Sequence, residues 1–145
     1  MTERILLALT LLLFASGDQV QQSWMSYERL LTSLYAIDDT VLPSDTTFFE
    51  PGGCYSVYTR LATIDGEDIE IFDYANSPSA ETAATQIAPD GYMVRTLTGA
   101  CMIDYVAPPH FFKDRNLIVL YVGKNSHILE VLSNVLGSQF AGTQP

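Results

Sequence analysis

The sequence predicts an α+β domain, with two or three helices packed on a mainly antiparallel sheet of four to five strands. The first observation is a hairpin. Cys54–Ile64 and Glu67–Tyr74 are rich in β-branched and aromatic residues, and Asp65-Gly66 between them suits a tight type I′ turn. The second is the order of the patterns, which runs helix, hairpin, helix, two or three strands, helix. Because strands and helices neither alternate strictly nor segregate, this order favours helices on one face of an antiparallel sheet.

One helix and one short strand are expected before the hairpin. Tyr27–Ile37 has apolar residues at the spacing of an amphipathic helix, and Ser26 is a suitable N-cap. Thr40–Leu42 is expected to form a short strand that Pro43 stops. Residues 43–53 are then expected to form a loop, because prolines and glycines interrupt them.

A second helix and two further strands are expected after the hairpin. Ser77 suits the N-cap and Pro78 the first helical position, while Pro89-Asp90-Gly91 ends the pattern. Tyr92–Leu97 and Met102–Val106 are the strand candidates that follow.

The last strand and the last helix have the clearest patterns of the second half. Asn116–Val122 is almost continuously apolar, which favours a strand buried on both faces. Ser126–Leu136 has a broad apolar face, with Asn125 as a suitable N-cap and Gly137 just past its end.

The first residues are expected to direct export and not to belong to the fold. Residues 1–17 are interpreted as a signal peptide, because Ile5–Ala15 is an apolar run of 11 residues and small residues follow at Ala15 and Gly17. Residues 18–25 are interpreted as a flexible leader, and residues 26–142 as a single domain. No apolar run reaches the roughly 18 to 20 residues that a transmembrane helix needs.

Acidic residues dominate the charge. The formal net charge is −10, and residues 18–90 hold 13 acidic residues against Arg29 and Arg60. Nucleic-acid binding is not expected, because it needs a concentrated basic surface. The acidic half favours a basic partner or a cation, or serves solubility alone.

The two cysteines have two interpretations. In an exported protein, Cys54 and Cys101 are expected to form a disulfide, and the alternative is two separate buried thiols. Closing a loop of this length would be worth roughly 4 kcal/mol in the chain-entropy model. A thiol enzyme could only be assembled from Cys101, His110 and Asp104, a combination without a recognisable signature.

Two groups of potential metal ligands are better explained as solvated surface. His127 and Glu130 are three residues apart on the last helix, and no third ligand is apparent. Asp65, Glu67, Asp68 and Glu70 crowd the hairpin, but their spacing is not that of an EF-hand, and strand alternation sends Glu67 to the opposite face from Asp68 and Glu70. No metal or other cofactor is therefore expected.

Residues 107–113 are the least ordinary stretch of the chain. Pro108 and Pro109 are expected to hold His110, Phe111 and Phe112 as a rigid corner between two strands. If the rings are exposed, this corner is a candidate binding site for another protein. The favoured interpretation buries both Phe rings in the core and leaves His110 partly exposed.

A set of short segments carries a family resemblance. The segments are Ile64–Asp68 (IDGED), Phe72–Ala75, Ile87–Gly91, Val106–Phe112 with its APPHFF, Leu117–Gly123 (LIVLYVG) and Val135–Gly142 (VLGSQFAG). Over roughly residues 28–142 the chain resembles a family of small uncharacterised bacterial exported proteins and lipoproteins. The resemblance implies export and the fold, and no activity, ligand or catalytic residue. The chain departs from the family in lacking a lipobox cysteine and in having cysteines at 54 and 101, which favours a disulfide particular to this chain.

Two functions of different class follow as hypotheses. The first is a non-enzymatic module of the cell envelope, expected to be a monomer, that binds another envelope protein or a small ligand through its acidic sheet or through Pro108–Phe112. The second is an envelope hydrolase or thiol enzyme that uses Cys101, His110 and Asp104. An enzyme needs polar groups that converge on a cleft, whereas a binding module needs only an exposed apolar patch.

Overall fold

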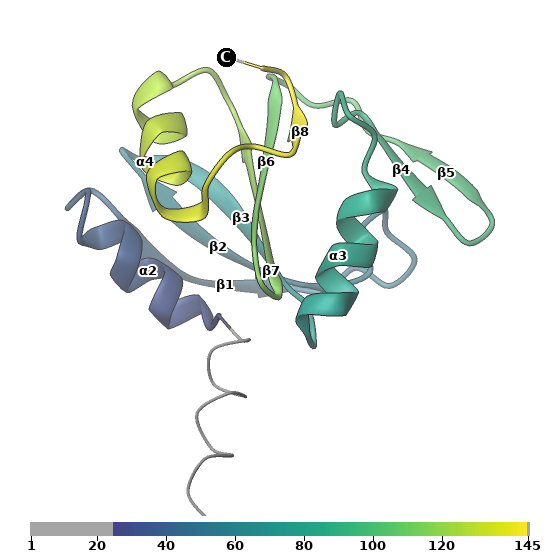
Figure 1. The fold of residues 1–145 in the computed structure, drawn as a ribbon, viewed down its shortest axis with the longest axis horizontal. Helices are drawn as coiled ribbons and strands as arrows, with labels where there is room; N and C mark the ends of the chain where they lie inside the picture. The colour runs from purple at the N-terminus through teal and green to yellow at the C-terminus, as the bar shows by residue number, and fades with distance from the viewer. Residues whose placement is uncertain (1–24, 145) are drawn as a thin grey trace, which may run out of the picture.

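A computed structural model describes residues 25–144 as an α+β fold (Figure 1), which confirms the predicted class. The predicted signal peptide and residues 18–24 of the predicted leader lie outside the described residues. The main sheet has six strands in the order β1-β2-β3-β7-β6-β8, and a separate two-stranded sheet pairs β4 with β5. The main sheet is thus wider than the four to five strands predicted. None of the helices in residues 25–144 has the length and apolar character needed to cross a bilayer.

The predicted hairpin is the centre of the sheet. Strands β2 (Tyr58–Ile64) and β3 (Glu67–Asp73) pair antiparallel along their whole length. Asp65 and Gly66 join them with φ values of 53° and 78°, the left-handed conformation that a two-residue hairpin turn requires. On its other side β3 pairs with β7 (Leu117–Val122), whose first five residues are all buried. The central, two-sided burial predicted for this strand is confirmed.

Two helices cover the first face of the sheet. Ser26 is the N-cap of helix α2 (Tyr27–Tyr35), as predicted, and its hydroxyl oxygen accepts a hydrogen bond from the Arg29 amide at 3.1 Å. Asn125 is the N-cap of helix α4 (Ser126–Leu136), as predicted. Both helices lie on the same side of the sheet in Figure 1. The core beneath them is built mainly from α2, α4, β3 and β7, and its largest fully buried members are Leu30, Leu34, Ile64, Ile69, Ile71, Phe112, Leu117 and Tyr121.

The second face of the sheet is covered more thinly. Helix α3 (Ser77–Gln86) lies over it, with the small sheet of β4 (Met93–Thr96) and β5 (Gly99–Met102) at its side (Figure 1). The N-cap of α3 is Asn76, one residue before the predicted Ser77, because the Asn76 side chain accepts from the Ser79 amide at 2.9 Å. Only Ala80 of α3 is fully buried. The core on this face includes Phe72 and Phe111 of the sheet, but the helix that covers them contributes only small side chains.

The segment predicted as a loop between Pro43 and Gly53 begins as a strand. Strand β1 (Leu42–Phe48) pairs with β2 at the edge of the sheet, and its register shifts between Pro43 and Thr47. Pro43 lies inside this strand and does not stop it. A proline is tolerated there because an edge strand leaves one row of amides without a ladder partner.

The predicted corner at residues 108–112 is also a strand. Strand β6 (Pro109–Asp114) pairs with β7 on one side and with the short β8 (Ala141–Gly142) on the other. The strand predicted at Met102–Val106 is placed a few residues too late, since β5 ends at Met102. Both errors arise because prolines and glycines shift the apparent boundaries of strands that are fixed by pairing with distant residues.

Candidate functional site

A disulfide joins two segments of the chain that lie beside two cavities of the described surface. Cys54 and Cys101 are bonded, with their Cα atoms 5.6 Å apart, so the predicted bridge is confirmed. It joins the segment before β2 to β5, across the second face of the sheet. Two cavities share Cys54 and its neighbour Tyr55 in their linings.

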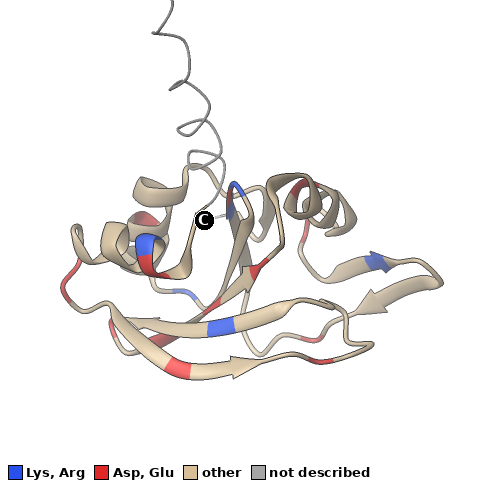
Figure 2. Ribbon diagram, turned by 90° about the horizontal axis from the view of Figure 1, so that it is seen from below, with Lys and Arg blue, Asp and Glu red and all other residues tan. Residues whose placement is uncertain are grey.

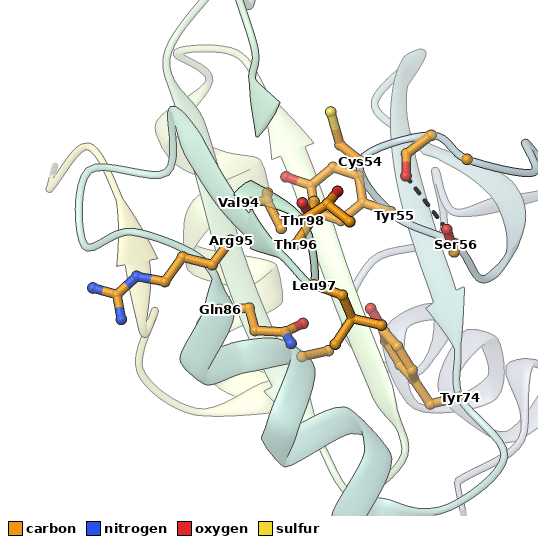
Figure 3. Close-up of a pocket in the computed structure, with 13 residues that line it drawn as sticks. Cys54, Tyr55, Ser56, Tyr74, Gln86, Val94, Arg95, Thr96, Leu97 and Thr98 are labelled. Carbon is orange, nitrogen blue, oxygen red and sulfur yellow. Dashed lines mark hydrogen bonds between the residues drawn. The ribbon is translucent and has the colours of Figure 1, made fainter. Parts of the chain in front are cut away.

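The larger cavity has a volume of about 430 Å³ and lies between α3, β4 and the segment before β2 (Figure 3). Its lining carries hydroxyl and amide groups from Ser56, Tyr74, Gln86, Thr96 and Thr98. Burial raises the pKa of Tyr74 to about 12, so this hydroxyl stays protonated at neutral pH. Among the described residues that line it, Arg95 alone has a charged side chain, and Figure 3 shows its guanidinium pointing away from the other labelled residues.

The smaller cavity has a volume of about 230 Å³ and opens directly onto the main sheet. Thr59, Glu70 and Leu120 line it from three neighbouring strands, β2, β3 and β7. The remaining lining comes from the end of β1, from the disulfide-linked segment and from the residues after β5: Phe48, Glu50, Cys54, Tyr55, Ile103 and Tyr105. This cavity therefore combines aromatic rings with carboxylates.

Tyr55 is fixed as the shared wall of the two cavities. Its ring stacks on Phe72 of the sheet, with the ring centroids 4.7 Å apart. Its hydroxyl lies 2.7 Å from the hydroxyl of Tyr105. Burial is the main cause that raises the pKa of both phenols, to about 12 for Tyr105, so both are protonated at neutral pH. Since one hydroxyl donates to the other, one of the two hydrogens remains available to a ligand.

Glu70 is the unusual group of the smaller cavity. It is only half-exposed, and within residues 25–144 no side chain forms a hydrogen bond or an ion pair with its carboxylate. Burial raises the pKa of Glu70 above its ordinary value, and the negative charge of Asp68 raises it further. Leu61 and Leu120 lie opposite it on the neighbouring strands. A carboxylate between two leucines without a counter-charge is costly, which is typical of residues kept for binding or chemistry.

Two other carboxylates of the hairpin, Asp65 and Glu67, have structural partners. Glu67 accepts a hydrogen bond from the Tyr121 hydroxyl at 2.6 Å, and the Asn125 amide group lies 3.3 Å from both Asp65 and Glu67. These contacts tie the hairpin tip to the start of α4. They also confirm that Glu67 faces the first core, since the Tyr121 ring is buried there.

The stretch considered as a binding corner is buried. Phe111 is fully buried in the second core and Phe112 is 2% exposed in the first, so the rings face opposite sides of the sheet and the structural interpretation of the rings is confirmed. Pro109 is buried and Pro108 is half-buried. His110 is 2% exposed, with Nδ1 2.9 Å from the Gln139 side-chain oxygen and Nε2 3.1 Å from the Gly123 carbonyl oxygen. The expectation of a partly exposed His110 is wrong, because this residue lies within a paired strand.

The structure does not bring Cys101, His110 and Asp104 together as a catalytic triad. The Cys101 sulfur is bonded to Cys54, and the two ring nitrogens of His110 lie against Gln139 and Gly123. Asp104 is exposed. No free thiolate is available at this position as a nucleophile.

His127, which was considered with Glu130 as a potential metal ligand on the last helix, has a structural contact. His127 Nε2 lies 2.6 Å from the Asp38 carboxylate, so it joins α4 to the end of α2. Hydrogen bonds from Thr40 are the main cause that lowers the pKa of Asp38, and His127 lowers it further. No group of three or more potential ligands lies together anywhere in residues 25–144.

Sequence reasoning missed Glu70, Tyr55 and Tyr105 as a site. Strand alternation did place Glu70 on the face opposite Glu67, but nothing in the local pattern shows that residues 103–105 and the disulfide-linked segment cover that face. A comparison of the chain with models of protein families gives no match, and comparisons with curated proteins and with solved structures give none either.

Proposed function

We propose that the chain is an exported, acidic binding module of the cell envelope, without enzymatic activity, and that it holds a small ligand in the disulfide-tethered cleft. The observation that carries this proposal is Glu70, a carboxylate without a basic partner that lines a cavity together with Phe48, Tyr55 and Tyr105. Sites that bind small molecules are typically apolar hollows with a few polar groups aimed into them.

Export is supported by the disulfide and by the start of the sequence. Disulfides form and persist in oxidising compartments such as the periplasm and the extracellular space. The described residues hold the Cys54–Cys101 bridge, and the residues before them have the pattern of a signal peptide. The family resemblance carried by the segments after residue 64 implies the same location.

Reversible binding is supported by the composition of the cleft. The two linings supply phenol, hydroxyl, amide and carboxylate groups on a rigid frame of sheet and disulfide. Neither lining includes a histidine or a free thiol, the groups that most often act as base and nucleophile in a hydrolase. Hydrogen bonding and ring stacking are the interactions that such a lining offers.

Ligand-observed and protein-observed NMR with a library of small cations, anions and neutral polyols tests the proposal. Binding ligands are expected to shift amide signals of residues 50–56, 70 and 103–105. A cavity-filling Ala83→Phe variant should weaken the binding of ligands to the larger cavity, because Ala83 lines it. Thr85→Phe, on the exposed side of the same helix, should leave that binding unchanged. Shifts confined to other surfaces, or absent for every compound, would contradict the proposal.

A further inference from the structure

We infer that the smaller cavity takes an organic ammonium ion with an apolar body, the cationic group lying beside Glu70 and the Tyr55 and Tyr105 rings. The inference rests on the proposed function and adds the chemical class of the ligand. Three features of the cavity carry it: the charge, the rings and the apolar surface around the opening.

The charge of the cavity calls for a cation. Glu70 and Glu50 are its two charged lining residues, and both are acidic. Arg60 is the basic residue nearest in sequence to Glu50 and Glu70, and it is engaged elsewhere. It pairs with Glu28 at 2.9 Å and lies over the Tyr27 ring on the first face of the sheet. Figure 2 shows the few basic positions scattered singly over the fold among the acidic ones. An anionic ligand would meet two carboxylates without a neutralising group.

The rings of the cavity suit an alkylammonium ion better than a metal ion. A cation over an aromatic face is attracted by the ring quadrupole, and quaternary ammonium groups are commonly recognised by several rings around them. Tyr55, Tyr105 and Phe48 all line the same cavity as Glu70. Calcium and magnesium require several oxygen ligands, and the described residues contain no group of three potential protein ligands.

The apolar surface around the opening suits a ligand with an apolar body. Phe48 is 42% exposed although it lines the cavity. Ile103 and Leu120 add further apolar side chains to the same lining. A ligand whose ammonium group reaches Glu70 would leave its alkyl or aryl part among these side chains. Removing that apolar surface from water adds to the binding free energy.

Three probes of equal chain length test the inference: hexyltrimethylammonium, hexanol and hexanesulfonate, each titrated into the purified protein by NMR and calorimetry. The cation should bind with shifts at residues 70 and 105, and the neutral and anionic probes should bind at least about tenfold more weakly. Glu70→Gln should lower the affinity for the cation by about tenfold, the size of one charge-assisted contact. Glu130→Gln removes the same charge from an exposed site on α4 and should have no effect.

A second pair of variants separates the ring from the hydroxyl. Tyr105→Phe keeps the ring and should weaken cation binding less than Tyr105→Leu, which should weaken it about threefold through the lost cation–π contact. Equal binding of hexanol or hexanesulfonate, or an unaffected Glu70→Gln variant, would overturn the ammonium assignment while leaving a ligand-binding cleft in place. If none of the three probes and no library compound shifts the cleft signals, the proposed function fails with it.

Discussion

Glu70 is a residue whose charged form lowers the stability of the fold. Its carboxylate has lost part of its hydration, and Asp68 adds a like charge. Since the folded state raises the pKa of this group above its ordinary value of 4.5, the folded state favours the protonated form. Stability linked to Glu70 is therefore fully present below the unfolded pKa and is lost as the pH rises through the raised folded pKa.

The Glu70→Gln variant should be more stable than the natural protein at pH 7 and equally stable at pH values below the ordinary pKa. The neutral amide removes both the cost of desolvation and the repulsion by Asp68, while Glu50, Tyr55 and Tyr105 still face the site. Thermal unfolding between pH 3.5 and 8 measures the difference, with Glu130→Gln as the control. A lower melting temperature at pH 7 would show that Glu70 has a stabilising partner.

Phe112 illustrates the opposite case, a residue that only packs. Phe112→Ala should lower the free energy of unfolding by about 3 to 5 kcal/mol, because the ring is 2% exposed in the first core and its removal leaves a cavity. Phe49→Ala, at a ring that is 45% exposed, should cost far less. Denaturant unfolding of the two variants gives both values. Similar losses for both would contradict the assignment of residue 112 to the core.

The elements that the sequence predicted well have local causes. The hairpin follows from Asp65-Gly66, a turn that needs positive φ at both positions. Helices α2 and α4 follow from an N-cap and an apolar face within a single segment. In each case the residues that decide the element lie within it.

The elements that the sequence misplaced are fixed by distant partners. In β6, His110 pairs with Tyr121 of β7 and with Gly142 of β8. The two residues of β8 have almost no strand pattern of their own, and Pro43 in β1 and Pro109 in β6 indicate breaks when read locally. Pairing with an existing strand outweighs those local preferences, and no pattern within one segment shows where the partner will be.

Gly142 should be the glycine of these edge strands at which a side chain is tolerated least. Its φ is 102°, and a Cβ atom added there would collide with the carbonyl oxygen of Pro109 in β6. Gly142→Ala should therefore lower the free energy of unfolding by roughly 1 to 3 kcal/mol. Gly66→Ala is the matched control, because Gly66 also has positive φ but open space around it, and should cost about 1 kcal/mol. Equal losses in thermal unfolding would mean that β8 can shift away from β6.

At the scale of the whole molecule, the two faces of the sheet differ in how they are covered. The first face is closed by α2 and α4 over large aliphatic side chains. The second is closed by an alanine-lined helix, a small hairpin and a disulfide, and both cavities around Tyr55 lie there. The disulfide was predictable from two cysteines in a chain that the sequence predicts to be exported. The cleft was not, because it joins residues from 48 to 120 that only the complete topology brings together.

Loss of the disulfide should affect this second face more than the first. The Cys54→Ser/Cys101→Ser variant should be less stable by up to about 4 kcal/mol, since the bridge closes a loop with a sequence separation of 47. The residues it joins are otherwise held by the Tyr55 ring on Phe72 and by the contact between the Tyr55 and Tyr105 hydroxyls. Local opening of segments 49–57 and 99–106 should therefore become easier than global unfolding.

Hydrogen exchange followed by mass spectrometry tests this difference between the faces. In the variant, amides of segments 49–57 and 99–106 should exchange faster at conditions where β3 and β7 keep their protection. A reductant should reproduce the effect in the natural protein and leave the serine variant unchanged. A uniform loss of protection across the sheet would instead mean that the bridge acts only by restricting the unfolded chain, and that the cleft keeps its shape without it.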